Sequence, residues 1–358
     1  MSDERALQAA IWEHPHDPTA RLVYADWLDD RGTESDAARA ELIRAHIELD
    51  RLDGDDPRFD ELERRADELE ERWGKAWSKA QPPGAKKVHC YTGGLPVPYL
   101  GNFKVDGLVK LGAARMRAAP LWRYHYGVYG RHLDQLLAWP HLHRLELFAL
   151  RPPLPDGWAE RLAACANLRN VSVLELIDCW PTAGELKTVL DAFTGRHLQR
   201  LRFNTEDADA LAVLARHPAV ANLRDLVIEE SRVPPDAVRL LAKTKARLLS
   251  FAFEHNRPGG DDVVSEVLRL PFVPKLRSLD LSQDRLTNAG AADLAAALQL
   301  ANLRTLWLNE NQIGVAGFRA LLASPHLARL ARLGTYSNPG ATGESMKAEL
   351  RNRFPDTF

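Results

Sequence analysis

Apolar residues recur along the second half of the chain in a pattern that changes within each period. A short stretch with apolar residues at every second or third position leads into a polar turn, and a stretch with helical spacing follows. The clearest copy runs from Leu303 through Leu306 and Leu308 to Asn311, and its helical part follows Gly317. Each period therefore predicts a strand, a turn and a helix.

The strand part of each period fits the template L-x-x-L-x-L-x-x-N/C, the signature of leucine-rich repeats. Eight copies begin at Leu142, Val171, Leu198, Leu223, Leu248, Leu276, Leu303 and Leu330. A strand with one apolar face cannot bury that face alone, so we expect the copies to stack side by side. The predicted fold class is α/β, a leucine-rich-repeat solenoid with a parallel β-sheet on its concave face and helices on its convex face. The long period is similar to that of ribonuclease-inhibitor-like repeats.

The ninth template position predicts a ladder of side chains inside the stack. A side chain there can bond backbone groups in the adjacent turns, and Asn suits this role because it has both donors and an acceptor. The residues found there are Leu150, Cys179, Glu206, Ser231, Asn256, Asp284, Asn311 and Asn338. Leu150 and Glu206 depart from the pattern, so their turns are either rebuilt or differently solvated. We expect Cys179 to be a ladder residue and not a nucleophile.

The first 80 residues carry no repeat and predict a small all-α domain of four helices. Asp17 and Pro18 are typical of a helix start, and Gly32 of a helix end. A third helix is expected from about Ser35. After the polar turn at 53–57, a fourth helix should pack against the third as an antiparallel hairpin. The apolar seam of that fourth helix consists of Phe59, Leu62, Ala66, Leu69 and Trp73.

One segment of this N-terminal part points to a family. The sequence RLVYADWLDDRG at 21–32, followed by RAELIR at 39–44, closely resembles the bacterial repeat-companion domain, over about residues 1–50. That resemblance implies a short helical module ahead of degenerate repeats, often leucine-rich ones, and it brings no activity or catalytic residue. The residues themselves favour a helix core with Tyr24 and Leu28 inside. The alternative is a face that docks a partner.

Charge is distributed unevenly along the chain. The first 80 residues hold 22 acids and 12 bases, a net charge of −10, whereas the whole chain has a net charge of −2. Bases dominate residues 81–135, which suggests that 1–80 dock on 81–135 within the chain, with an external acidic partner as the alternative. The predicted domains are an acidic helical domain at 1–80, a basic cap with a degenerate repeat at 81–135, and the solenoid with its C-terminal cap at 136–358.

Sequence motifs for catalysis are absent. The chain has no phosphate-binding loop, no nucleophile elbow and no paired-histidine zinc motif, and we expect neither a metal nor a cofactor. Cys90 is close in sequence to Lys86, Lys87 and His89, which could lower the pKa of its thiol. The alternative to a binding protein is therefore a Cys-dependent effector enzyme of the transferase or ligase type that uses Cys90. Three cysteines and the lack of a long apolar run indicate a reducing, cytoplasmic location without membrane contact.

Template positions three, five, seven and eight point away from the helices and form the candidate binding site. The acids at these positions are Glu146, Glu175, Asp178, Asp225, Glu229, Glu230, Glu254, Asp280 and Glu310, against the bases Arg144, Arg200, Arg202 and Arg332. The candidate aromatic anchors are Phe148, Trp307 and Tyr336. An acidic face repels nucleic acid and attracts basic surfaces. We therefore expect a non-catalytic module that binds a protein partner with a basic contact surface and serves as a regulatory, recruiting or sensing component.

Overall fold

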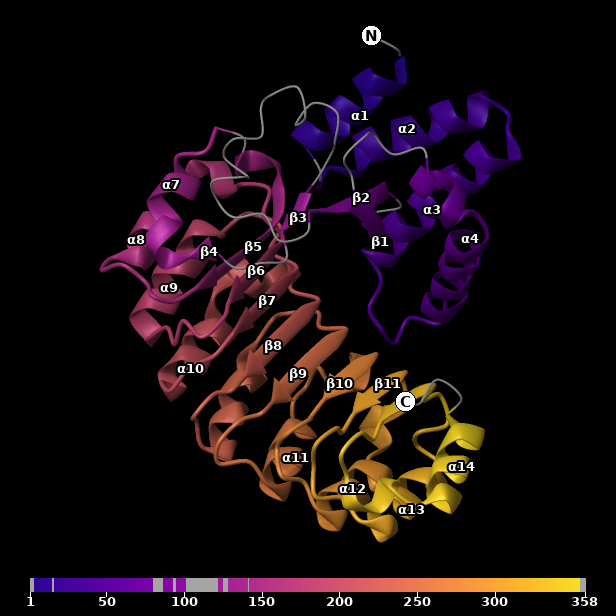
Figure 1. The fold of residues 1–358 in the computed structure, drawn as a ribbon, viewed down its shortest axis with the longest axis vertical. Coiled ribbons are helices and arrows are strands. Elements are labelled where there is room, and N and C mark those ends of the chain that lie inside the picture. Colours follow the sequence, from indigo (N-terminus) through magenta and orange to yellow (C-terminus); the bar gives the residue numbers. More distant parts are fainter. Residues whose placement is uncertain are drawn as a thin grey trace. The chain divides into compact units, whose positions relative to one another are not determined.

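The computed structural model describes residues 3–14, 16–79, 86–92, 95–100, 122–124, 128–140 and 142–354. The chain forms two compact units, residues 1–175 and residues 176–358 (Figure 1). The predicted three-part division at residues 80 and 135 stays a prediction.

The first unit begins with four helices. They are α1 (Asp3–Glu13), α2 (Pro18–Asp30), α3 (Glu34–Leu49) and α4 (Phe59–Lys79). The Asp17 carboxylate caps α2 by accepting a hydrogen bond from the Thr19 backbone N–H at 2.9 Å, as the sequence predicts. Thr33 caps α3 in the same way through the N–H of Asp36, so α3 begins slightly before the predicted Ser35.

Two apolar clusters hold these helices together. The first contains Tyr24 and Leu28 of α2 with Ile43 of α3, all essentially inaccessible to solvent. The second joins α3 to α4 through the predicted seam residues Ala66 and Leu69. Helices α3 and α4 pack side by side, which confirms the predicted hairpin. The α2 motif therefore contributes to a helix core through its apolar residues.

The remainder of the first unit contains short strands and turns. Its strands are β1 (Lys86–Thr92), β2 (Leu95–Leu100), β3 (Trp122–Tyr124), β4 (Val128–Tyr129) and β5 (Leu145–Arg151). Strand β6 (Val173–Leu176) extends to the boundary of the unit. Between them lie η1 (Gly130–His132), α7 (Leu133–Leu137), η2 (Leu142–Arg144), α8 (Trp158–Ala163) and η3 (Ala166–Leu168). β1 and β2 pair antiparallel, and β2, β3 and β5 then pair parallel in succession.

Six parallel strands form the sheet of the second unit, in the order of the chain. They are β7 (Arg200–Phe203), β8 (Asp225–Glu229), β9 (Ser250–Glu254), β10 (Ser278–Asp280), β11 (Thr305–Trp307) and β12 (Arg332–Gly334). Equal template positions lie side by side, because Leu279 pairs with Phe251 on one side and with Leu306 on the other. Each repeat thus adds one strand without a change of register.

Helical segments follow each strand, and together they cover one face of this sheet (Figure 1). They are α9 (Ala183–Ala192), α10 (Ala208–Arg216), η4 (Pro218–Asn222), η5 (Pro235–Lys243), α11 (Asp261–Val267), η6 (Val273–Lys275), α12 (Asn288–Ala296), η7 (Leu298–Leu300), α13 (Val315–Ala323), η8 (Pro339–Ala341) and α14 (Glu344–Arg353). Template residues such as Leu276, Leu279 and Leu281 are buried between the two layers. The fold class is therefore the predicted one, an α/β leucine-rich-repeat solenoid with a small N-terminal all-α part.

Candidate functional site

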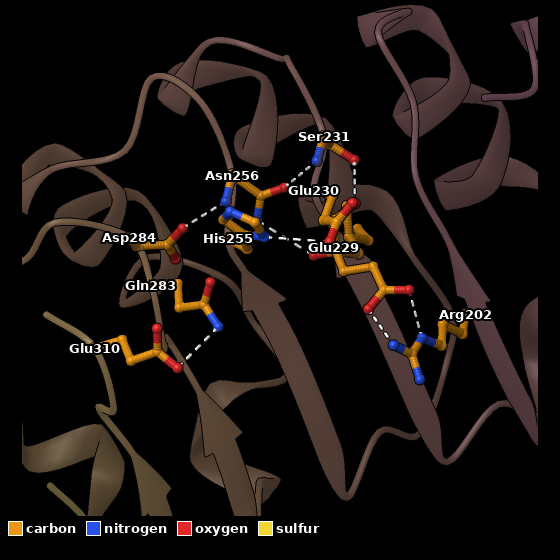
Figure 2. A network of polar contacts seen from close by, with 10 residues as sticks. Arg202, Glu229, Glu230, Ser231, His255, Asn256, Gln283, Asp284 and Glu310 are labelled. Carbon is orange, nitrogen blue, oxygen red and sulfur yellow. Dashed lines mark hydrogen bonds and ion pairs between the residues drawn. The ribbon is translucent and has the colours of Figure 1, made fainter. Parts of the chain in front are cut away.

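The ladder predicted at the ninth template position is present in the second unit. Asn311 accepts hydrogen bonds from the backbone N–H groups of Asp284 and Leu286, at 3.1 and 2.9 Å. Its amide donates to the carbonyl of Leu281 at 2.9 Å. The same step repeats along the stack, where Asp284 accepts from the N–H of Asn256 and Asn256 accepts from the N–H of Ser231 (Figure 2). Buried peptide groups of adjacent turns are thus satisfied by side chains.

Glu206 does not belong to this ladder. Its side chain is exposed and forms an ion pair with Arg232. Thr205, one position earlier, donates its backbone N–H to the Ser231 hydroxyl at 2.9 Å, and its own hydroxyl donates to the carbonyl of Pro181. A carboxylate that can only accept is unsuited to a position that must also donate, and the turn is rebuilt around threonine.

Template position eight has a left-handed backbone in most repeats of the second unit. The residues are Asp178, Glu230, His255, Gln283, Glu310 and Ser337, with φ between 48° and 61°. This conformation directs the N–H of Glu310 to the carbonyl of Tyr336 and the N–H of His255 to the carbonyl of Ser282. The two bonds join each turn to the next repeat beyond the end of the strands. The strain of a left-handed non-glycine residue is offset by that bond.

Two of the predicted bases on the sheet face neutralise two of the predicted acids. The guanidinium of Arg202 forms a bidentate ion pair with Glu229 (Figure 2). Arg200 lies 3.1 Å from the Asp225 carboxylate. Glu229 is 9% exposed, and burial raises the pKa of Asp225 against the effect of Arg200. Asp225 and Glu229 are therefore engaged within the chain, which the sequence pattern alone did not reveal.

Glu254 and Asp280 form a carboxyl pair at the centre of the face. They come from the neighbouring strands β9 and β10, and their side chains are close enough to share a hydrogen bond. Burial, followed by the charges of Asp280 and Glu229, raises the pKa of Glu254 to about 7. Burial also raises the pKa of Asp280, whose carboxylate accepts from the Ser282 N–H at 2.9 Å. No arginine or lysine of the described residues forms an ion pair with either carboxyl.

Two aromatic residues lie on or just after the strands that follow this carboxyl pair in the sheet. Trp307 of β11 pairs with Asp280 of β10 in the strand register and with Gly334 of β12 on its other side. A β-carbon at Gly334 would approach the indole to 2.4 Å, so the glycine makes room for the ring to lie on β12. Tyr336, just after β12, is 68% exposed. We call the outward residues Glu254, Asp280, Trp307 and Tyr336, with the ion-paired Asp225 and Glu229, the acidic face.

Three predicted site residues are in the first unit, and they are buried. Phe148 is 1% exposed, and Glu146 and Glu175 are also almost inaccessible. The prediction that they are outward contact residues is wrong for these positions. The physical reason is that every residue of β5 from Leu145 to Leu150, and every residue of β6, is buried, so each strand is covered on both faces and not on one.

The remaining predicted acids lie at the rim. Glu230 is exposed and its carboxylate contacts the imidazole Nδ1 of His255 at 3.3 Å, while exposed Glu310 accepts from Gln283 at 3.4 Å (Figure 2). Asp178 is half-buried in its turn. His255 was not singled out from the sequence, because position eight has no residue preference in the template. The structure thus divides most of the predicted acids of the second unit into three groups. Asp225 and Glu229 are ion-paired, Glu254 and Asp280 form the carboxyl pair, and Glu230 and Glu310 contact polar side chains at the rim.

Other chemistry in the described residues is structural. A surface pocket between α9 and α10 contains His217, whose Nε2 lies 3.0 Å from Asp191 and whose Nδ1 accepts from the Ala219 N–H. Both ring nitrogens are therefore used to hold the turn. Within the described part of the chain, no group of three or more His, Cys, Asp or Glu is placed to hold a metal ion, and no helix is long and apolar enough to span a membrane. The side chain of Cys90 lies outside the described residues.

Comparisons with known proteins give only distant structural similarities. No protein-family model matches the chain, and no curated protein matches it in sequence. The resemblance of residues 1–50 to the repeat-companion domain therefore stays a prediction.

Three of the solved structures to which the chain is similar are the following. The TLR13–ssRNA13 complex has 17% identity and a TM-score of 0.34, over 61% of this chain and 34% of that one. An internalin, InlF, from Listeria monocytogenes has 17% identity and a TM-score of 0.32, over 69% of this chain and 73% of that one. The yeast Rad7–Elc1 complex has 13% identity and a TM-score of 0.39, over 83% and 89%. The chain spans about a third of the TLR13 chain, and these low scores carry no argument about function.

Proposed function

We propose that the chain is a non-catalytic protein-interaction module that binds a protein partner through the acidic face of its second unit. The observation that carries this proposal is the Glu254–Asp280 carboxyl pair, in which neither carboxyl forms an ion pair with an arginine or lysine of the described residues, and which is followed in the strand register by Trp307. The partner's contact surface is basic. The role is that of a regulatory, recruiting or sensing component of a cytoplasmic pathway, and the bacterial origin is what the resemblance of residues 1–50 implies.

The electrostatics of the carboxyl pair favour a cationic ligand group. Burial is the main cause that raises the pKa of Glu254, and repulsion by the charges of Asp280 and Glu229 raises it further. A lysine or arginine side chain from a partner would relieve the repulsion and restore both charges. Trp307 is the register neighbour of Asp280, and its ring, which packs over Gly334, gives a cation bound to this face a nearby aromatic surface.

The length of the acidic face and its negative charge favour a protein over other ligands. Six strands about 4.8 Å apart span about 25 Å, which matches roughly seven residues of extended chain. A phosphate backbone would meet carboxylates here and be repelled. Exposed Tyr336 and half-buried Trp307 are the residue types that contribute most binding energy at protein interfaces.

The test begins with an affinity pull-down from native lysate that has been treated with nuclease, followed by mass spectrometry. Each captured protein is then purified, and its binding kinetics are measured against variants of this chain. Glu254→Gln and Asp280→Asn together remove charge without changing shape, and we expect association to slow by roughly tenfold. Tyr336→Ala should mainly speed dissociation. A rise in salt should slow association of the wild type more than of the double variant.

Two matched controls locate the binding site. Asp293→Asn removes an exposed acid from the helical side of the same unit, and Asp30→Lys reverses an exposed charge in the N-terminal helices. Both should bind as the wild type does. If Asp30→Lys alone abolishes binding, the N-terminal helices hold the site and the proposal is wrong. A partner that is captured from untreated lysate but not from nuclease-treated lysate would instead make nucleic acid the ligand.

A further inference from the structure

The asparagine ladder has a repeating geometry that defines what each rung must do. The side-chain oxygen accepts from a backbone N–H in the turn of the preceding repeat, which is the N–H of the preceding rung for Asn256, Asp284 and Asn311 and that of Ile313 for Asn338. The side-chain amide of each asparagine donates to the carbonyl at template position six of the preceding repeat. Asn256 donates to Ile228 at 3.2 Å, Asn311 to Leu281 at 2.9 Å and Asn338 to Leu308 at 2.7 Å. A rung in this series is therefore both an acceptor and a donor.

Asp284 occupies one of these rungs with a carboxyl group. Its Oδ1 accepts from the Asn256 N–H at 2.8 Å, as an asparagine oxygen would (Figure 2). Its Oδ2 is buried and has no hydrogen-bond partner, although the residue is 0% exposed. Oδ2 stands where the other rungs place their donating nitrogen. By analogy with those rungs, the carbonyl expected to face Oδ2 is that of Phe253, which occupies position six of the preceding repeat.

We propose that Asp284 is a neutral carboxylic acid in the folded protein, and that its Oδ2–H donates to the carbonyl of Phe253 as the amides of the neighbouring rungs do. The proton supplies the donor that an ionised carboxylate lacks. Asp284 then completes the ladder as an isostere of asparagine. Loss of this proton removes one hydrogen bond of the ladder and leaves a buried charge. The contact between the repeats of β9 and β10 is therefore sensitive to pH.

The surroundings of Asp284 agree with the neutral form. Burial is the main cause that raises its pKa well above the ordinary value, and the charges of Asp280 and Glu254 raise it further. The N–H of Asn256 opposes this shift. The adjacent rungs, Asn256 and Asn311, are neutral amides. No basic group among the described residues is a cause of the shift.

The pH dependence follows from the raised pKa. An unfolded aspartate loses its proton near pH 4, whereas folded Asp284 keeps it to a higher pH. Between those two values the folded state binds one more proton than the unfolded state, so stability is complete at low pH and falls as pH rises. Above the folded pKa this contribution no longer changes. One such proton changes the unfolding equilibrium constant tenfold per pH unit.

The decisive measurement is the ¹³C chemical shift of the Asp284 carboxyl carbon in aspartate-labelled full-length protein between pH 5 and 9. The signal that is missing in Asp284→Asn identifies the residue. We expect the shift of a carboxylic acid at pH 7, where exposed aspartates give that of a carboxylate. In Asp280→Asn, which removes a neighbouring charge but no rung, the titration of Asp284 should move to lower pH. An ionised Asp284 at pH 5 to 6 would overturn the proposal.

Urea unfolding as a function of pH gives a second, independent result. Asp284→Asn should stay folded, and its unfolding constant should rise with pH less steeply than that of the wild type. Asp284→Ala should be destabilised at every pH, because both hydrogen bonds are lost. If Asp284→Asn is as unstable as Asp284→Ala, or keeps the full wild-type pH slope, the donor role assigned to the proton is wrong.

Discussion

Asn311 shows how much a single side chain contributes to a stacked fold. It bonds two backbone N–H groups and the carbonyls of Leu281 and Leu308, all of them buried. Asn311→Ala would leave these groups without partners, and we expect a loss of about 1–3 kcal/mol in the free energy of unfolding. The neighbouring exposed Gln312 is the control, and Gln312→Ala should change stability by less than about 0.5 kcal/mol. Thermal melts of the two variants measure this difference. Equal losses of stability in the two variants would contradict the ladder role of Asn311.

Gln283 tests the left-handed row at template position eight. Its φ of 61° is unfavourable for β-branched residues, and its N–H donates to the carbonyl of Asn309 at 2.9 Å. Gln283→Val should therefore cost about 1–2 kcal/mol, whereas Gln283→Asn should be close to neutral because asparagine adopts this conformation readily. Denaturant titration of both variants gives the comparison. Similar stabilities would mean that this turn adopts another backbone conformation in solution.

At the scale of the strands, the carboxyl pair between β9 and β10 makes binding depend on pH. Glu254 has a pKa of about 7 when no partner is bound, and a bound cation favours its ionised form. Affinity for the basic partner should therefore rise as pH increases from 6 to 8, by up to tenfold per unit below the pKa. Glu254→Gln should bind more weakly and show a flatter profile. Calorimetric titration at several pH values measures this, and an affinity that falls with rising pH would argue against a cationic ligand group.

At the scale of the whole molecule, the uneven charge distribution leads to an interaction that can be measured. If residues 1–80 dock on residues 81–135, separate fragments 1–80 and 81–358 should associate at low salt. The association should weaken as salt rises through about 0.1–0.5 M, because screening shortens the range of the attraction. Calorimetry on the two fragments provides the test. Fragments that do not associate at low salt would leave the N-terminal helices available to an external partner.

The extent of sequence-based prediction differs between the fold and the site. The repeat period predicted the strands, their parallel order and the rung at Asn311, because each rests on local spacing. Glu206 was recognised from the sequence as a departure from the ladder, but the sequence left open whether its turn is rebuilt or differently solvated, and the structure shows a turn rebuilt around Thr205. Phe148 was placed wrongly on the surface, because alternation along a strand identifies two faces but not whether both are covered.

The sequence by itself determined the fold class, the stacking register and the acidic character of the outward positions, because these follow from residue type and period. Only the tertiary structure decided which acids remain without a counter-charge. Arg202 and Glu229 are 27 residues apart, and they meet because adjacent repeats bring equal and near-equal positions together. The same stacking buries the Asp284 carboxyl next to Asp280 and Glu254. Charge state depends on neighbours and on burial, and a linear sequence specifies neither directly.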